Sequence, residues 1–343
     1  MTNPRLNIPH VLDDPPPLHY KLLDYGERPY WTPDGERVAF IESNYGDACE
    51  IALETCKVRD LTKGLGKHHS FLRVLVLSNG DYLLIGPKEF KDRDISRHVE
   101  SELWVLDKNC KTPPKPLGRR IFEGCGVSTS APRITYAISG RNDPSLGGPN
   151  IYECHVTEIV YGSDGPELGQ DWVIYRADGG HRPEPQDFRC DETEVIMAEY
   201  IGNRKEDPEN WKCVVKGVKI ETSEVRTYID EPQVHNECEG IFPDHEHICL
   251  ESSCDEIGSY PPIDLWKLKL DGSACRVRMT QFYNRPPWRA SNSNVSPDGK
   301  WLAFMVNTRT DEAGYGRGLG LLDLEAWEKT PEAQQWEMAE HSR

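Results

Sequence analysis

The feature that most constrains this chain is a recurring Pro-Asp-Gly turn that separates a polar segment from an alternating apolar strand. Residues 28–43 read RPYWTPDGERVAFIES, and residues 291–307 read SNSNVSPDGKWLAFMVN, with the same order of polar start, turn and strand. Weaker copies of this pattern occupy residues 73–87, 126–139, 187–200 and 238–252. Because glycine readily adopts the positive φ that a tight hairpin turn requires, the pattern predicts a pair of antiparallel strands in each copy.

A second pair of strands is predicted after each copy, in short apolar segments such as SELWVLD (101–107) and IDLWKLKL (263–270). One four-stranded sheet cannot bury both of its faces, whereas sheets stacked around an axis cover one another. We therefore predict an all-β fold, a six-bladed β-propeller with four-stranded antiparallel blades, as a single domain over residues 1–343. The predicted blades cover residues 28–63, 71–118, 125–169, 184–230, 235–282 and 291–327.

The segment before the first copy, NIPHVLDDPPPLHYKLL (7–23), is predicted to be extended. Pro15, Pro16 and Pro17 exclude a helix there, because proline cannot donate the helical hydrogen bond. The segment is expected to form either a strap across the ring or a strand that closes it.

The charge of the chain excludes two classes of partner. Its formal net charge is −17, which repels phosphate backbones and anionic lipid surfaces. No stretch approaches the roughly 18 to 20 consecutive apolar residues that a membrane-spanning helix needs. We therefore expect neither a nucleic acid nor a membrane as partner.

Eleven cysteines without any Cys-x-x-Cys pair favour an oxidising compartment. Cys49 and Cys56 flank an apolar run, and Cys238 and Cys249 lie nearly symmetrically about a predicted turn, so both pairs are placed for cross-strand disulfides. We predict a protein of the secretory pathway whose leader is absent from these residues. The alternative is a cytoplasmic protein whose cysteines are small core residues.

The WTPDGERVAF and VSPDGKWLAF frames resemble the PD40 repeats of TolB-like propellers, and the resemblance covers roughly residues 28 to 325. Two narrower resemblances concern function. Oligogalacturonate lyases are TolB-like propellers that use a metal ion near the channel, and His68, His69, Gln186 and His235 stand at comparable positions here. The opening NIPH and LLDYGERPYWTPDG, with the block HNECEGIFPD, also resembles fungal propellers of natural-product pathways, including hetero-Diels–Alderases of tropolone sesquiterpenoid biosynthesis.

Candidate site residues follow from aligning the copies, because the inner strand of each propeller blade lines a central channel. His235 and Arg28 are predicted hydrogen-bond donors to a substrate carbonyl, with Glu237 and Gln186 supporting them as catalytic residues. Trp31 and Phe242 are predicted to wall the substrate. The other predicted substrate-binding residues are Tyr30, His69, Arg73, Asn292 and Arg289.

The fungal resemblance implies an enzyme that needs no cofactor and joins a tropolone quinone methide to a humulene-type sesquiterpene by hetero-Diels–Alder cyclisation. Its partner would be a small hydrophobic substrate, and no residue is assigned to a metal. Proximity and orientation would supply most of that catalysis. The alternatives are a metal-dependent lyase of the oligogalacturonate type and a non-catalytic propeller that binds a ligand or a protein. The oligomeric state is left open.

Overall fold

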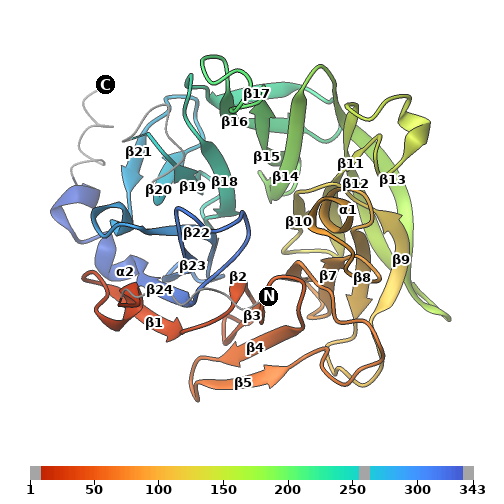
Figure 1. Cartoon of the computed structure of the whole chain (residues 1–343), viewed down its shortest axis with the longest axis horizontal. Helices are drawn as coiled ribbons and strands as arrows, with labels where there is room; N and C mark the ends of the chain where they lie inside the picture. The colour runs from red at the N-terminus through yellow and green to blue at the C-terminus, as the bar shows by residue number, and fades with distance from the viewer. Residues whose placement is uncertain (1–8, 255–262, 335–343) are drawn as a thin grey trace.

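Six four-stranded antiparallel sheets stand around a central axis in the computed structural model, which describes residues 9–254 and 263–334 (Figure 1). The predicted all-β, six-bladed propeller is therefore confirmed. The predicted domain ends at residues 1 and 343 lie outside the described residues.

The first five blades are each built from four consecutive strands, running from the channel outward. Their bounds are β2 (Glu27–Trp31), β3 (Arg37–Ile41), β4 (Ala48–Ala52) and β5 (Lys57–Asp60); β6 (Arg73–Val76), β7 (Tyr82–Gly86), β8 (Glu102–Leu106) and β9 (Lys115–Arg120); β10 (Cys125–Val127), β11 (Arg133–Ser139), β12 (Tyr152–Gly162) and β13 (Gly165–Ala177); β14 (His181–Arg189), β15 (Glu194–Ile201), β16 (Lys212–Lys219) and β17 (Val225–Ile229); and β18 (Asn236–Ile241), β19 (His247–Ser252), β20 (Asp264–Lys269) and β21 (Arg276–Arg278).

The sixth blade closes the ring with strands from both ends of the chain. It contains β22 (Trp288–Val295), β23 (Trp301–Thr308), β24 (Leu319–Asp323) and β1 (His19–Leu23). β1 pairs antiparallel with β24, with His19 opposite Leu322, so the two ends of the colour range meet in one sheet of Figure 1. Of the two predictions for the N-terminal segment, the closing strand is correct.

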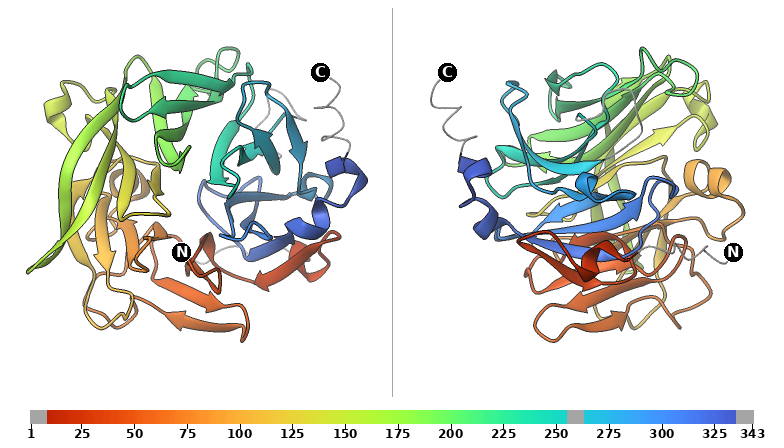
Figure 2. Two further views of the ribbon diagram at one scale, coloured as in Figure 1. Left: turned by 180° about the vertical axis from the view of Figure 1, so that it is seen from behind. Right: turned by 60° about the vertical axis from the view of Figure 1, so that its left-hand side comes forward.

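Helical structure is sparse in the described residues. Its elements are α1 (Arg93–His98), α2 (Leu324–Trp327) and the 3₁₀ turns η1 (Val11–Asp13), η2 (Pro144–Leu146) and η3 (Phe282–Asn284), and residues 331–334 are also helical. α1 stands out from one face of the ring, as the turned view of Figure 2 shows. None of the helices described is long and apolar enough to span a membrane.

The two clearest Pro-Asp-Gly copies form the same turn. In blade 1, Asp34 accepts hydrogen bonds from the Thr32 hydroxyl and from the backbone N–H of Glu36, the latter at 3.0 Å. In blade 6, Asp298 accepts from the Ser296 hydroxyl at 2.6 Å and from the N–H of Lys300 at 3.1 Å. The glycines that follow have φ of +71° and +73°, conformations that cost residues with a Cβ more energy. The local pattern therefore specifies both hairpins.

Apolar clusters fill the space between neighbouring blades all around the ring. One cluster joins Ile41 of β3 to Leu84 of β7, and another joins Phe40 of β3 to Met305 of β23, so blade 1 is packed on both faces. Corresponding clusters lie between blades 2 and 3, 3 and 4, 4 and 5, and 5 and 6. This burial is the main favourable term that holds radially stacked sheets together.

The predicted disulfides are absent, because all eleven cysteines are free. Cys49 is buried in β4, where its thiol donates to Asp60 at 3.5 Å, while Cys56 lies exposed in the following turn. Cys238 lies opposite Leu250, so the neighbouring Cys249 points to the other face of the sheet and joins a different core cluster. The cysteines therefore give no support to secretion, which stays a prediction.

Candidate functional site

The six inner strands β2, β6, β10, β14, β18 and β22 surround the central channel (Figure 1). Residues at the start of these strands, such as Arg28 and Arg73, line a cavity of about 740 Å³ at one mouth, which we call the N-end cavity. Residues at their ends, such as Trp31 and Val295, line a cavity of about 370 Å³ at the other mouth, the C-end cavity. A pocket of only about 30 Å³ lies between them in the channel.

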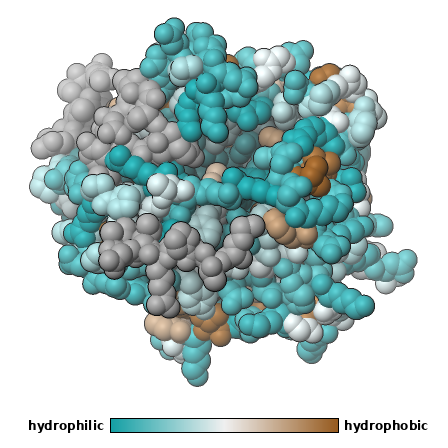
Figure 3. Space-filling model, in the orientation of Figure 1, coloured by the Kyte–Doolittle hydropathy of each residue, from teal (hydrophilic) through white to brown (hydrophobic). Residues whose placement is uncertain are grey.

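The N-end cavity is strongly charged. Its described cationic residues are Arg28, Arg73, Arg93, Arg97, Arg182, Arg204, Lys205 and Arg289. Its described acidic residues are Asp94, Glu123, Glu184, Glu237 and Glu251. The face that carries α1 is largely hydrophilic (Figure 3). The lining has eight cationic and five acidic side chains, so the excess charge of this cavity is positive although the net charge of the chain is −17.

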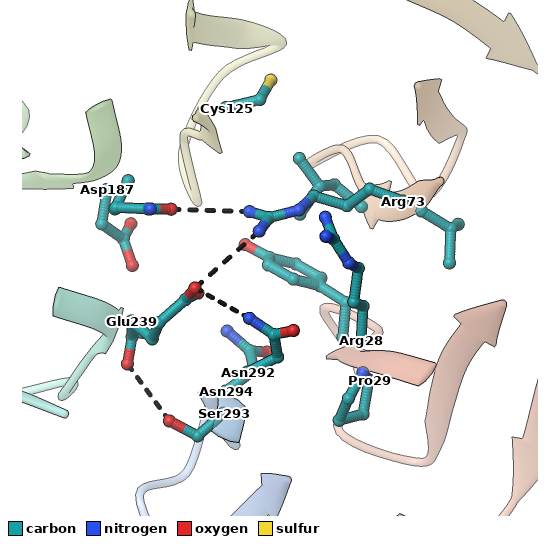
Figure 4. A pocket seen from close by; sticks show the side chains of 14 residues that line it. Arg28, Pro29, Arg73, Cys125, Asp187, Glu239, Asn292, Ser293 and Asn294 are labelled. Atoms are coloured by element: carbon teal, nitrogen blue, oxygen red, sulfur yellow. Dashed lines mark hydrogen bonds and ion pairs between the residues drawn. The ribbon is translucent and has the colours of Figure 1, made fainter. Parts of the chain in front are cut away.

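Arg28 is the most unusual residue of the cavity. Its exposed fraction is 7%, and among the described residues its guanidinium has no hydrogen bond or ion pair; Figure 4 draws none. Burial and the charge of Arg73 lower the pKa of Arg28 to about 10. Its backbone φ is +52°, a left-handed conformation that strains a residue with a side chain. Gly314 lies against the guanidinium, where any Cβ would collide with it.

A polar network lies beside Arg28 in the channel (Figure 4). Arg73 donates to the Gln186 side-chain oxygen at 3.4 Å, and its Nη2 lies 3.8 Å from Glu239 Oε1. The Asn292 amide donates to the same Glu239 oxygen at 3.1 Å. Arg73, Gln186, Glu239 and Asn292 thus line the narrow pocket that lies between the two larger cavities.

One wall of the N-end cavity carries His235, Glu237 and Glu251. Glu237 of β18 lies directly opposite Glu251 of β19, and His235 Nε2 is 3.3 Å from Glu237 Oε2. One ligand atom from each of the three residues lies within 4.8 Å of those of the other two. His235 also stacks on Trp211, with ring centroids 6.4 Å apart and planes 10° apart. These three residues are of the types that can hold a metal ion, although the sequence analysis assigned none.

Several carboxyl groups here have shifted pKa values. Burial, followed by the charge of Glu237, raises the pKa of Glu184 to about 7. Burial also raises the pKa of Glu251, and Glu237 and Glu239 add to the shift. Burial acts in the same sense on Glu237, but the hydrogen bonds of His235 and Tyr200 and the charges of His235 and Arg73 together outweigh it and lower its pKa. A cavity in which one carboxyl group has a raised pKa and a neighbouring one has a lowered pKa is typical of acid–base catalysis.

The rim of the cavity is held by α1 and the β23–β24 loop. Arg93 and Arg97 of α1 donate to the carbonyl oxygen of Ala313 at 3.1 and 3.0 Å. Arg97 also pairs with Glu123, and Asp94 accepts two hydrogen bonds from Arg141 at 3.0 and 2.6 Å. α1 is therefore tied to blade 3 and to the last blade, and it holds its cations over the mouth.

The structure divides the predicted site residues among three places. Six of them line the N-end cavity together: His235, Arg28, Glu237, Arg73, Asn292 and Arg289. Gln186 and Tyr30 line the narrow channel pocket, Tyr30 also reaching the C-end cavity, and Trp31 and Phe242 line the C-end cavity. The two predicted aromatic walls thus lie at the mouth opposite His235.

His69 lies in none of these cavities as far as the structure describes them. It hydrogen-bonds to Asp47 at 2.7 Å, between blades 1 and 2. His69 lies four positions before the start of β6. Aligning the sequence copies on their turn residues therefore predicted it to be closer to the channel than it is.

Sequence reasoning did not assign Glu251 or Arg97 to the site. Glu251 comes from the second strand of its blade, and Arg97 from an inserted helix, so neither belongs to the inner-strand positions that were compared. A glutamate within the apolar run ICLES was the available signal for Glu251, since such strands rarely bury an acid without a reason.

No sequence model of a protein family matches the chain, and the search of curated proteins found no match. Solved structures do resemble it. A TolB-type protein of Agrobacterium tumefaciens has a TM-score of 0.56 at 14% identity, over 83% of this chain and 90% of that one. A gluconolactonase of Xanthomonas campestris has a TM-score of 0.54 at 13% identity, over 89% and 88% of the two chains.

An oligogalacturonate lyase in complex with manganese has a TM-score of 0.51 at 12% identity, over 89% of this chain and 79% of that one. Identities this low carry information about fold and not about activity. The chain therefore has the six-bladed β-propeller fold seen in TolB-like proteins.

Proposed function

We propose that this protein is a lyase that cleaves a carboxylate-bearing sugar in the N-end cavity by elimination. The observation that carries the proposal is the buried Arg28 guanidinium, which has no partner among the described residues and lines a cavity rich in cations. A buried cation without a partner is costly, and a carboxylate from a ligand would pair with it through two parallel hydrogen bonds.

The size and chemistry of the cavity support a small acidic substrate. Its volume of about 740 Å³ lies within the range of roughly 300 to 1,000 Å³ that is usual for small-molecule sites. A sugar acid offers one carboxylate and several hydroxyl groups, which match the arginines, Asn292 and Ser291 of the lining. Two structural neighbours with the same fold, an oligogalacturonate lyase and a gluconolactonase, are named for sugar-acid chemistry.

Elimination needs the charge of the substrate carboxylate to be neutralised. The proton on the adjacent carbon leaves more easily when a cation holds the carboxylate, and Arg28 is placed for that role. Glu237 lines the same cavity, and its lowered pKa keeps its carboxyl group ionised, so its carboxylate accepts this proton. The carbon–carbon double bond then forms as the carbon–oxygen bond at the next carbon breaks. Glu184 supplies the proton to the departing oxygen, because its pKa is raised to about 7 and about half of its carboxyl groups are therefore protonated near neutral pH.

The hetero-Diels–Alder cyclisation predicted from resemblance has less support. It requires a mostly apolar cavity beside His235 and Arg28, whereas the lining around those two residues is mainly charged. The apolar residues predicted as walls, Trp31 and Phe242, lie in the C-end cavity. The N-end cavity suits an anion better than a hydrophobic sesquiterpene.

The proposal is tested by incubating the protein with oligogalacturonate and with a neutral oligosaccharide. We expect an unsaturated uronate product, followed by its ultraviolet absorbance, from the acidic sugar only. Arg28→Met should weaken oligogalacturonate binding about 10- to 100-fold in calorimetry, the usual effect of losing a charge-assisted hydrogen bond.

A matched control is Arg226→Met, since Arg226 is exposed on β17 and lies outside the described cavities. This variant should bind as the wild type does. Removing the buried charge of Arg28 should not lower the melting temperature, so a loss of binding cannot be attributed to unfolding. Cleavage that yields reducing ends without an unsaturated product, or equal binding by both variants, would contradict the proposal.

A further inference from the structure

Two glutamates face each other across one pair of strands in the wall of the N-end cavity. Glu237 of β18 and Glu251 of β19 are direct antiparallel partners, and the exposed fraction of Glu251 is 3%. Like charges directly opposite each other in a sheet destabilise it, and burial away from water strengthens the repulsion. Such a pair is stable only when a proton or a cation offsets the charge.

His235 adds a nitrogen ligand to the same wall. It lies two residues before Glu237, and alternate residues of an extended strand share a face. Its Nε2 is 3.3 Å from Glu237 Oε2, and Trp211 and Tyr200 pack against its ring at centroid distances of 6.4 and 5.8 Å. The imidazole is thus held in place beside both carboxylates.

The three side chains form a group of the size that surrounds one metal ion. One ligand atom from each of His235, Glu237 and Glu251 lies within 4.8 Å of the other two. Atoms that bind one ion at about 2.0 to 2.2 Å are necessarily no farther than about 4.4 Å apart, so a small movement of the side chains completes the set. The cavity beside them leaves room for water or a substrate oxygen as further ligands.

We propose that His235, Glu237 and Glu251 bind a divalent first-row metal ion, Mn²⁺ or Zn²⁺. One imidazole with two carboxylates is a mixed nitrogen–oxygen set, which suits these ions better than Ca²⁺ or Mg²⁺, whose protein sites are built from oxygens. The proposal does not rest on the lyase activity. It gives His235 the role of a ligand, which differs from the donor role predicted from the sequence.

The test is calorimetric titration of the chelator-treated full chain with MnCl₂ and with ZnCl₂, combined with thermal unfolding. We expect saturable binding at a single site and a melting temperature that rises with metal concentration, because a metal that binds only the folded state stabilises it. Glu251→Gln should reduce the affinity at least about 10-fold.

The matched control is Glu184→Gln, which removes a half-buried carboxyl group from the same cavity but not from this group. Its metal affinity should stay within about threefold of the wild type, a change of under 1 kcal/mol. Without metal, Glu251→Gln should melt no lower than the wild type, because it removes the cross-strand repulsion. The proposal would be overturned if neither metal bound saturably, which is the result expected if Arg289 or a shared proton neutralises the two glutamates. It would also be overturned if Glu251→Gln and Glu184→Gln lost metal affinity equally.

Discussion

At the scale of single residues, the channel is built from buried charges that are only partly compensated. Arg28 combines a strained backbone with a buried guanidinium, and sites that keep such strain are often functional. Asp187 is buried as well, and it accepts hydrogen bonds from the N–H groups of Ile241 and Phe188 at 2.8 and 2.9 Å. These charges cost stability, so their effect on unfolding can be measured.

Asp187 makes the stability of the fold depend on pH. Burial raises its pKa from 3.8 to about 7, so the folded chain retains a proton that the unfolded chain loses above about pH 4. The stability from this group is full below the unfolded pKa and falls as pH rises through about 7. Asp187→Asn should therefore be more stable than the wild type near pH 8, by up to about 4 kcal/mol, with a smaller difference near pH 5. Urea unfolding at both pH values measures this; a difference that is independent of pH would refute it.

At the scale of strands, close approach of neighbouring blades restricts the inner strands to small residues at particular positions. Gly126 of β10 faces the backbone of β14, where an added Cβ would lie 2.5 Å from the Gln186 carbonyl oxygen. That contact is far below van der Waals distance, and backbone cannot move aside as a flexible side chain can. The narrow channel therefore depends on this glycine.

Gly126→Ala should lower the free energy of unfolding by about 1 to 3 kcal/mol, the usual cost of overpacking. Gly162→Ala is the matched control, because its Cβ would be 3.8 Å from the nearest atom, a side-chain oxygen of Glu167. Thermal or urea unfolding of the two variants checks the difference. Equal melting temperatures would show that β10 and β14 are farther apart than described.

Sequence patterns predicted the strands well and the site only in part. The Pro-Asp-Gly turns are local, so their residues specify the hairpins wherever they occur. Which mouth a residue faces depends on its position along the inner strand: Trp31 follows Arg28 by three residues, about 10 Å of extended chain, and reaches the other cavity. Glu251 was missed because it is the cross-strand register that places it opposite Glu237, and this register cannot be predicted from the residues of either strand alone.

At the scale of the whole molecule, an acidic chain encloses a cationic cavity. The blades bring Arg28, Arg73, Arg182 and Arg289 from four different sheets to one mouth, and α1 adds Arg93 and Arg97. Low-dielectric walls focus the field of such a group, so a small anion is drawn to the mouth although the net charge is −17. The β1–β24 closure keeps these sheets in place around the axis.

A crystal of the protein soaked with galacturonate would show whether Arg28 binds the carboxylate of a sugar acid in the N-end cavity. We expect the sugar in this cavity, with its carboxylate within hydrogen-bond distance of the Arg28 guanidinium. A sugar bound only at the C-end cavity, or a carboxylate held elsewhere while Arg28 stays without a partner, would contradict it.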